Sequence, residues 1–179
     1  YGTTGRFGDI PATIFKVTTD GVFTTLVEFA EGENPLATMV QGSDGDFYGV
    51  TSGLDEVDGT ILNHGTIFRM TPAGVLTTML EFTGNEGPNL GSSPEAALVQ
   101  GSDGNFYGTT PYGGADDHGT IFRMTAEGVL TTLFEFGRND NGSLPYAALV
   151  QGNDGDFYGT THLGGIGYGT AFKITPDGE

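Results

Sequence analysis

The sequence predicts an all-β fold, a β-propeller of four-stranded antiparallel blades, with about 3.5 blades in this chain. The first observation is a decapeptide, GSDGDFYGVT at 42–51, that returns almost unchanged at 101–110 and 152–161. The second is the spacing of its Tyr-Gly pair, which recurs after 47, 59 and 51 residues, counted from Tyr1. A catalytic motif is needed once, whereas a module that cannot bury its own faces has to be stacked. The recurrence therefore indicates architecture.

Each unit contains four short apolar segments, which we call A, B, C and D. In the third unit they cover 96–101, 105–110, 119–125 and 128–136. The segments are rich in Val, Ile, Thr, Phe and Tyr, are bounded by Gly, Asp, Asn or Pro, and are too short for typical helices. These properties predict β-strands.

Turn residues separate the segments at fixed places. Ser-Asp-Gly at 102–104 is expected to fold segment A onto segment B. Between C and D, a glycine at 18–23, 71–76 and 125–130 suits a type I turn that closes with a residue of positive φ. We therefore interpret the repeated decapeptide as a structural hairpin.

Segment D indicates that each sheet lies between two others. By strict alternation, Leu130, Phe134 and Phe136 fall on one side, and Val129 and Leu133 fall on the other. Because both sides are apolar, both need cover, and radial stacking of four-stranded sheets provides it. A β-solenoid is the alternative, although its repeats are usually shorter.

We expect a single propeller domain or propeller segment over 1–179, with blade-like units at 1–29, 36–82, 95–136 and 146–179. The segments amount to 14 strands, with 3, 4, 4 and 3 per sheet. Open strand edges at both ends favour pairing with other protein chains or with further repeats that complete the ring. A ring of four blades, a symmetric pair of chains and a slice of a longer polypeptide are all compatible with this count.

The composition restricts the partners. With 23 Asp and Glu against 6 Lys and Arg, the formal net charge is −17. Such a charge repels phosphate backbones, so nucleic-acid binding is not expected, and neutral glycans or cations such as Ca²⁺ are the suitable partners. The chain has no Cys and no apolar run long enough for a membrane span, so we expect neither a membrane span nor a signal peptide within it.

The third unit reads P-x-AALVQGSDGNFYGTT-x2-GG-x4-GTIFRMT-x2-GVLTTLFEF. This pattern resembles the GloVer tandem repeats of bacterial surface proteins, and the resemblance covers essentially the whole chain. It implies a β-propeller-like fold and an extracellular or cell-surface location, without a defined biochemistry. A more distant resemblance connects the DGNFYGTT and FRMT-x2-G rhythm with streptogramin lyase propellers. No catalytic residue is carried over from the lyase, because Thr51, Thr110 and Thr161 replace its strand B acid.

Functional residues are expected on one rim of the ring. Antiparallel strands place the A–B and C–D turns on one rim, the turn rim, and the B–C and D–A loops on the other, the loop rim. The loop rim carries every change in length, and function on a repeat scaffold usually lies where loops vary. Its rings and polar groups suit a sugar. We predict a ligand-binding site without catalytic residues, formed by Tyr112, Asp116, Asp117, His118, Tyr146, His162 and Tyr168, on a rim that also holds Asp55, Glu56, Asp58 and His64.

No resident metal or other cofactor is expected. The three histidines lack the close spacing of zinc ligands. The Asp-Gly-Asp pairs at 44–46 and 154–156 could bind Ca²⁺, but they lack the EF-hand pattern, and turn hydrogen bonds account for them. Charges that recur in every unit are interpreted as structural: Lys16, Arg69, Arg123 and Lys173 on segment C, with Glu28, Glu81 and Glu135 on segment D.

The sequence thus favours a non-catalytic extracellular binding or structural module whose partners are glycans and other protein chains. The alternative is a lyase or glycan-acting enzyme with an acidic site near the propeller axis. An enzyme should carry unique polar residues on strand A or B of one unit, whereas these segments are nearly identical.

Overall fold

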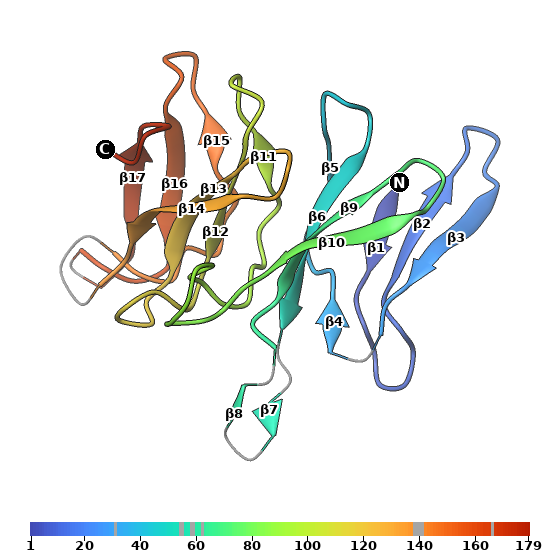
Figure 1. Cartoon of the computed structure of the whole chain (residues 1–179), viewed down its shortest axis with the longest axis horizontal. Helices are drawn as coiled ribbons and strands as arrows, with labels where there is room; N and C mark the ends of the chain where they lie inside the picture. Colours follow the sequence, from blue (N-terminus) through green and yellow to red (C-terminus); the bar gives the residue numbers. More distant parts are fainter. Residues whose placement is uncertain (31, 54–55, 58–59, 62, 138–141, 166) are drawn as a thin grey trace.

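The computed structural model describes the chain except residues 31, 54–55, 58–59, 62, 138–141 and 166. The described residues form β-strands and no helices. The strands make four antiparallel sheets and one small hairpin (Figure 1). None of the described residues belongs to a helix that is long and apolar enough to cross a membrane. The predicted all-β architecture is confirmed.

The sheets follow one another along the chain, and the first and fourth lie at opposite ends of the molecule in Figure 1. The first sheet contains β1 (Gly2–Thr4), β2 (Thr13–Val17) and β3 (Phe23–Glu28). The second contains β4 (Glu33–Asn34), β5 (Val40–Gln41), β6 (Phe47–Gly53), β9 (Thr66–Met70) and β10 (Leu76–Glu81). The third contains β11 (Val99–Gln100), β12 (Phe106–Thr110), β13 (Thr120–Met124) and β14 (Leu130–Glu135). The fourth contains β15 (Val150–Gln151), β16 (Phe157–Thr161) and β17 (Thr170–Ile174).

Among the described residues, all 14 predicted strands are present, together with three strands that were not predicted. Two of these, β7 (Glu56–Val57) and β8 (Thr60–Ile61), form the separate hairpin. The third, β4, pairs with the end of β6. These two-residue strands escaped prediction because they carry no alternating apolar pattern. Segment A is shorter than expected, since only its Val-Gln pair is extended in each of three sheets.

Aromatic stacking joins consecutive sheets. At each of the three interfaces, a strand B Tyr of one unit meets the strand B Phe of the next, with ring centroids about 4 Å apart. The measured separations are 4.2 Å for Tyr1 and Phe47, 4.0 Å for Tyr48 and Phe106, and 3.9 Å for Tyr107 and Phe157. Three apolar clusters, one between each pair of neighbouring sheets, surround these contacts. Face-to-face stacking therefore buries both sides of the inner sheets.

Strand D corrects the prediction in one detail. β14 skips Leu133 in its pairing with β13, so this residue forms a β-bulge. The extra residue inverts the alternation, so Leu130 packs toward the second sheet while Phe134 and Phe136 pack toward the fourth. Placing Leu130 on the same side as Phe134 and Phe136 was wrong, and so was the expected cover of Val129, which is 61% exposed. Both faces of the strand are nevertheless apolar.

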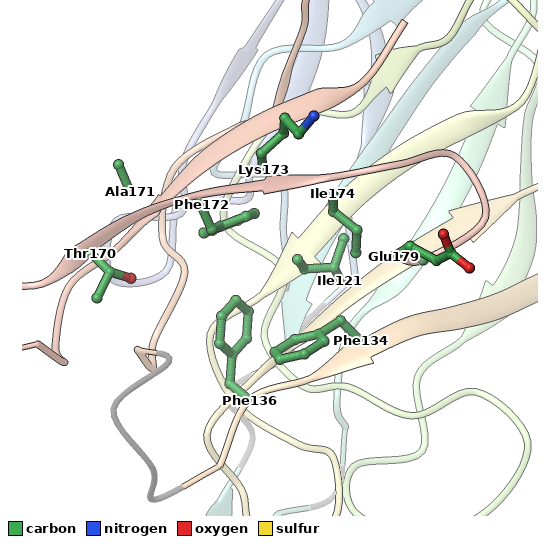
Figure 2. Close-up of a pocket in the computed structure, with 10 residues that line it drawn as sticks. Ile121, Phe134, Phe136, Thr170, Ala171, Phe172, Lys173, Ile174 and Glu179 are labelled. Atoms are coloured by element: carbon green, nitrogen blue, oxygen red, sulfur yellow. The ribbon is translucent and has the colours of Figure 1, made fainter.

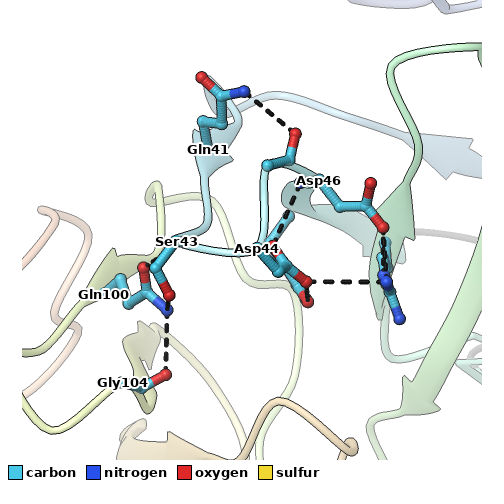
Figure 3. A network of polar contacts seen from close by, with 9 residues as sticks. Gln41, Ser43, Asp44, Asp46, Gln100 and Gly104 are labelled. Carbon is cyan, nitrogen blue, oxygen red and sulfur yellow. Dashed lines mark hydrogen bonds and ion pairs between the residues drawn. The ribbon is translucent and has the colours of Figure 1, made fainter.

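A second set of contacts joins the sheets along the turn rim (Figure 3). Gln100 accepts a hydrogen bond from the backbone of Ser43 in the preceding sheet (2.9 Å) and donates to Gly104 of its own turn (3.0 Å). Gln151 repeats this bridge with Ser102 (2.9 Å). The predicted A–B turn is confirmed, because Gly104 has a φ of 85° and donates to the carbonyl of Gly101 (2.9 Å). Each repeated turn thus closes its own hairpin and contacts the next sheet.

Three of the four recurring cations have polar partners on this rim, as expected for structural residues. Arg69 lies 2.6 Å from Asp46, and Lys173 lies 2.6 Å from Asp156. In the third unit Asn105 replaces this aspartate, and Arg123 instead donates to the carbonyl of Pro176 in the fourth sheet (3.2 Å). The same cation position therefore serves within a sheet or between sheets, depending on its neighbour.

Candidate functional site

The structure places a cleft of about 660 Å³ on the loop rim, between the second and third sheets. In Figure 1 the A–B turns lie at the upper edge of the sheets, and the loops after β6, β12 and β16 lie at the lower edge. Residues that line the cleft include His64, Thr83, Glu86, Ser92, Tyr112 and Asp117. His64 comes from the B–C loop of the second sheet, and Tyr112 and Asp117 come from the B–C loop of the third. The others come from residues 83–94, the D–A loop that connects the two sheets.

His64 lines this cleft and is held there by its neighbours. Its Nδ1 lies 3.0 Å from the hydroxyl of Ser92, which is buried. A Cβ on Gly84 would lie 2.6 Å from the imidazole, so only glycine leaves room for the ring there. His64 also borders a smaller cavity of about 290 Å³ that includes Glu33 and Glu81. The imidazole therefore separates two polar spaces.

The connection beneath the cleft is shaped by the repeat. Ser93 has a φ of 54° and donates its backbone N–H to the carbonyl of His64 (2.8 Å). In the next unit, Leu144 has a φ of 58° and makes the same bond to His118 (3.0 Å). Because a leucine adopts this conformation too, the left-handed backbone at Ser93 belongs to the D–A connection and gives no evidence for function.

Asp117 shapes the opposite wall. It has a φ of 56°, a conformation that aspartate tolerates better than most residues, and its Oδ1 accepts a hydrogen bond from the backbone of Gly113 (2.7 Å). The loop is further fixed by Glu135, whose Oε2 accepts from the backbone of Ala115 (2.7 Å). These bonds hold an exposed carboxylate residue at the mouth of the cleft.

A chain of three predicted ring residues leads away from the cleft. The hydroxyls of Tyr112 and Tyr146 lie 2.7 Å apart, and the ring of His162 meets that of Tyr146 edge-on at 5.9 Å. Both tyrosines are about one-third exposed, at 37% and 36%. The hydrogen bond with Tyr112, together with burial, raises the pKa of Tyr146 to about 12. The pair thus presents two hydroxyls and partly open ring faces.

Glu95 adds an acid to this neighbourhood. It lies directly before segment A of the third unit, where the second and fourth units have Leu36 and Tyr146. Burial raises the pKa of Glu95, and its charge in turn favours the neutral form of Tyr146. Glu95 is therefore a polar residue peculiar to one unit, which our sequence reasoning did not single out.

The predicted residues fall into three groups. Tyr112 and Asp117 line the cleft, and Tyr146 and His162 extend from Tyr112. Asp116, His118 and Tyr168 lie on the same rim but do not line the cleft, and Tyr168 is 90% exposed. Of the other polar residues of this rim, His64 lines the cleft, Asp55 and Asp58 lie outside the described residues, and Glu56 lies in β7.

The sequence named His64 and Tyr112 but missed their neighbours Ser92, Glu86 and Thr83. The available signal was the length of the loop at 83–94. Only the stacking of the sheets brings this loop against both B–C loops, so spacing along the chain could not reveal the contacts.

Other polar groups have structural partners. The strand B threonines that replace the lyase acid bond to strand C threonines, with Oγ1 atoms 2.7–2.8 Å apart in the pairs Thr51–Thr66, Thr110–Thr120 and Thr161–Thr170. The two carboxylate oxygens of Asp44 accept from the backbone of Asp46 (3.1 Å) and from Tyr48 (2.8 Å). Among the described residues, no group of three or more His, Cys, Asp or Glu side chains is arranged to hold a metal ion.

Comparison with known proteins gives one family and several structural neighbours. The model of a family described as the Gloeobacter/Verrucomicrobia repeat matches residues 1–179. No curated protein matches the chain.

The structural neighbours share the fold at low sequence identity. The periplasmic gluconolactonase of Pseudomonas aeruginosa is 15% identical, with a TM-score of 0.58 over 88% of this chain and 46% of its own. A luciferin-regenerating enzyme is 12% identical, with a TM-score of 0.55 over 97% of this chain and 57% of its own. The extracellular domain of a protein assigned to a one-component system of B. thetaiotaomicron is 11% identical, with a TM-score of 0.57 over 93% of this chain and 20% of its own. The present chain thus spans between 20% and 57% of the length of these proteins.

Proposed function

Because this chain belongs to the Gloeobacter/Verrucomicrobia repeat family, we propose that it is a non-catalytic binding module of an exported protein and that it takes a neutral, hydroxyl-rich ligand, such as a glycan, in the loop-rim cleft. The periplasmic and extracellular neighbours support export. The net charge of −17 favours a neutral ligand over an anionic one.

The observation that carries the proposal is the composition of the cleft around Tyr112. This ring is 37% exposed and faces a space that is also lined by His64, Ser92 and Asp117. A sugar needs an apolar surface for its C–H groups and both donors and acceptors for its hydroxyls, and this lining supplies each of them.

Thr83 gives independent support. Its Oγ1 is buried and has no hydrogen-bond partner among the described residues, although Thr83 lines the cleft. Buried hydroxyls are normally satisfied, so an orphaned one suggests a missing partner such as a ligand hydroxyl or a bound water.

A screen on an array of neutral oligosaccharides, followed by calorimetry with the best binder, tests the proposal. Tyr112→Ala should weaken binding by about tenfold or more, because a stacking surface is lost. Tyr146→Ala should weaken it less, since Tyr146 orients Tyr112 through the bond between their hydroxyls. Tyr168→Ala is the matched control, because that ring is 90% exposed and lies outside the cleft. Binding that survives both Tyr112→Ala and Tyr146→Ala would refute the proposal.

Glu95 favours a second candidate, a glycan- or lactone-acting enzyme. A desolvated carboxyl with a raised pKa is suited to donate a proton, and it occurs in one unit only. The name of the P. aeruginosa neighbour makes glucono-δ-lactone the obvious probe. Lactone hydrolysis that is lost in Glu95→Gln would favour this enzyme over the binding module.

A further inference from the structure

Two tyrosines from neighbouring sheets form a corner on the loop rim, beside the cleft. Tyr112 follows β12 of the third sheet, and Tyr146 precedes β15 of the fourth. Their ring planes are inclined at 85°, with centroids 6.3 Å apart, and their hydroxyls lie 2.7 Å apart. The bond between the hydroxyls therefore holds the two rings as adjacent walls that stand at a right angle.

Glu95 adds a negative charge to this corner. It has in the third unit the position that Tyr146 has in the fourth, and it is close enough for its charge to raise the pKa of Tyr146. The side chain of Glu95 is partly buried, yet it forms no hydrogen bond or ion pair with any residue in the described part of the chain. A carboxylate that loses water without gaining a partner favours a cation nearby.

The corner is open to solvent, and this openness belongs to its position in the repeat. Leu36 has the position of Tyr146 in the second unit, where a complete sheet follows, and it is 47% exposed. The corner is also separate from the larger hollows nearby. Tyr146 and Glu95 do not line the loop-rim cleft, and neither tyrosine lines the cavity of about 390 Å³ along β17 (Figure 2).

We propose that Tyr112, Tyr146 and Glu95 form a binding site for a quaternary ammonium cation such as choline. The face of an aromatic ring attracts a cation, and methylated ammonium groups bind between ring walls because they combine a charge with an apolar surface. Glu95 supplies the opposite charge. The net charge of −17 also raises the concentration of cations around the protein.

An ammonium group of this kind fits the corner better than a metal ion or a sugar. A metal ion needs several oxygen or nitrogen ligands, and no group of three or more His, Cys, Asp or Glu side chains in the described part of the chain is arranged to provide them. A sugar packs along one aromatic face, whereas two walls at 85° suit a compact, rounded group. A lipid headgroup would bring a phosphate toward an acidic rim, so the free cation is the better match.

The test is a titration of the full chain with choline, followed by nuclear magnetic resonance. Choline should shift the ring resonances of Tyr112 and Tyr146 and leave those of Tyr168 unchanged. Its uncharged isostere, 3,3-dimethylbutan-1-ol, should bind at least about tenfold more weakly, because it has the shape without the charge. Phosphocholine should also bind more weakly than choline, which separates the free cation from a lipid headgroup.

Three variants assign the binding to the corner. Tyr146→Leu should weaken choline binding by about fivefold or more, and Tyr146→Phe should retain most of it, because phenylalanine keeps the ring face. Leucine is the natural residue at this position of the second unit, so the first variant should fold. Glu95→Gln keeps the shape of the side chain, removes its charge, and should also weaken binding by about fivefold or more.

The proposal goes beyond the glycan cleft and is tested apart from it. Glu95→Gln should leave glycan binding unchanged, because Glu95 does not line the cleft. A chain that binds choline but no glycan would refute the proposed function and support this site. The site itself is overturned if choline gives no saturable shift of the two rings, or if the isostere or phosphocholine binds as tightly as choline. It is equally overturned if Tyr146→Leu and Glu95→Gln bind choline as tightly as the unchanged protein.

Discussion

Residues of the same type have different roles here, depending on whether a following sheet covers them. Tyr107 and Tyr158 occupy equivalent positions, and the hydroxyl of each donates a hydrogen bond to the aspartate of its own A–B turn. The distances are 2.8 Å from Tyr107 to Asp103 and 2.6 Å from Tyr158 to Asp154. Tyr107 is fully buried against Phe157, whereas Tyr158 is 41% exposed. Stability should therefore depend on stacking, with the hydrogen bond as a smaller contribution.

This matched pair gives a first prediction. Tyr107→Ala should lower the free energy of unfolding by about 3 to 5 kcal/mol, as for other buried aromatic rings, because it opens a cavity against Phe157. Tyr158→Ala should lower it by about 1 kcal/mol or less. Urea denaturation of the two variants measures the difference, and equal losses would show that stacking between sheets is not what stabilises the fold.

The same tyrosines predict how stability depends on pH. Burial, followed by the hydrogen bonds to Asp44 and Asp103, raises the pKa of Tyr48 and of Tyr107 from 10.0 to about 12. A raised pKa in the folded state means that the neutral phenols stabilise the fold fully below pH 10 and that this stability is lost as the pH rises through about 12. Tyrosinate absorbance and circular dichroism should therefore change together in that range. Ionisation of these tyrosines without unfolding would contradict the assignment.

At the scale of the elements, strands B and C of each sheet approach closely at a glycine. A Cβ on Gly108 would lie 2.5 Å from Phe122 and 2.9 Å from Leu98, and Gly49 and Gly159 have the same environment. This contact explains why glycine follows the tyrosine in every repeat: the strand C phenylalanine packs over the glycine and leaves no room for a Cβ.

Gly108→Ala should therefore cost about 1 to 3 kcal/mol, since the Phe122 ring must shift within a packed interface. Gly5→Ala is the control, because its Cβ would have no neighbour closer than 3.5 Å, and it should cost less than about 1 kcal/mol. Thermal unfolding of both variants checks the prediction. A neutral Gly108→Ala would mean that Phe122 does not occupy this place.

The glutamine bridges allow a further comparison between sheets. Gln41 bonds only within its own turn among the described contacts, whereas Gln100 also bonds to Ser43 of the preceding sheet. We expect Gln100→Ala to cost about 1 kcal/mol more than Gln41→Ala, which is the typical value of one such bond. Urea denaturation measures both costs, and identical values would show that the bridge adds nothing.

For the molecule as a whole, recurrence was enough to predict the stacked sheets, because each copy repeats the same Tyr, Phe and Gly. The bulge at Leu133 was not predicted, because strict alternation assumes unbroken pairing with strand C; the same bulge recurs at Leu26 and Met79 in the other strands D. The candidate site was predicted in part. Tyr112 and Asp117 were named, but their proximity to Ser92 and Thr83 depends on loops that only stacking brings together.

The central claim is that consecutive units stack face to face around a shared axis. Nuclear Overhauser contacts between aromatic rings test it most directly in a chain of 18.7 kDa. We predict contacts from Tyr48 to Phe106 and from Tyr107 to Phe157, whose centroids lie 4.0 and 3.9 Å apart. The absence of both, together with backbone contacts that pair β10 with β11 in one continuous sheet, would contradict the account.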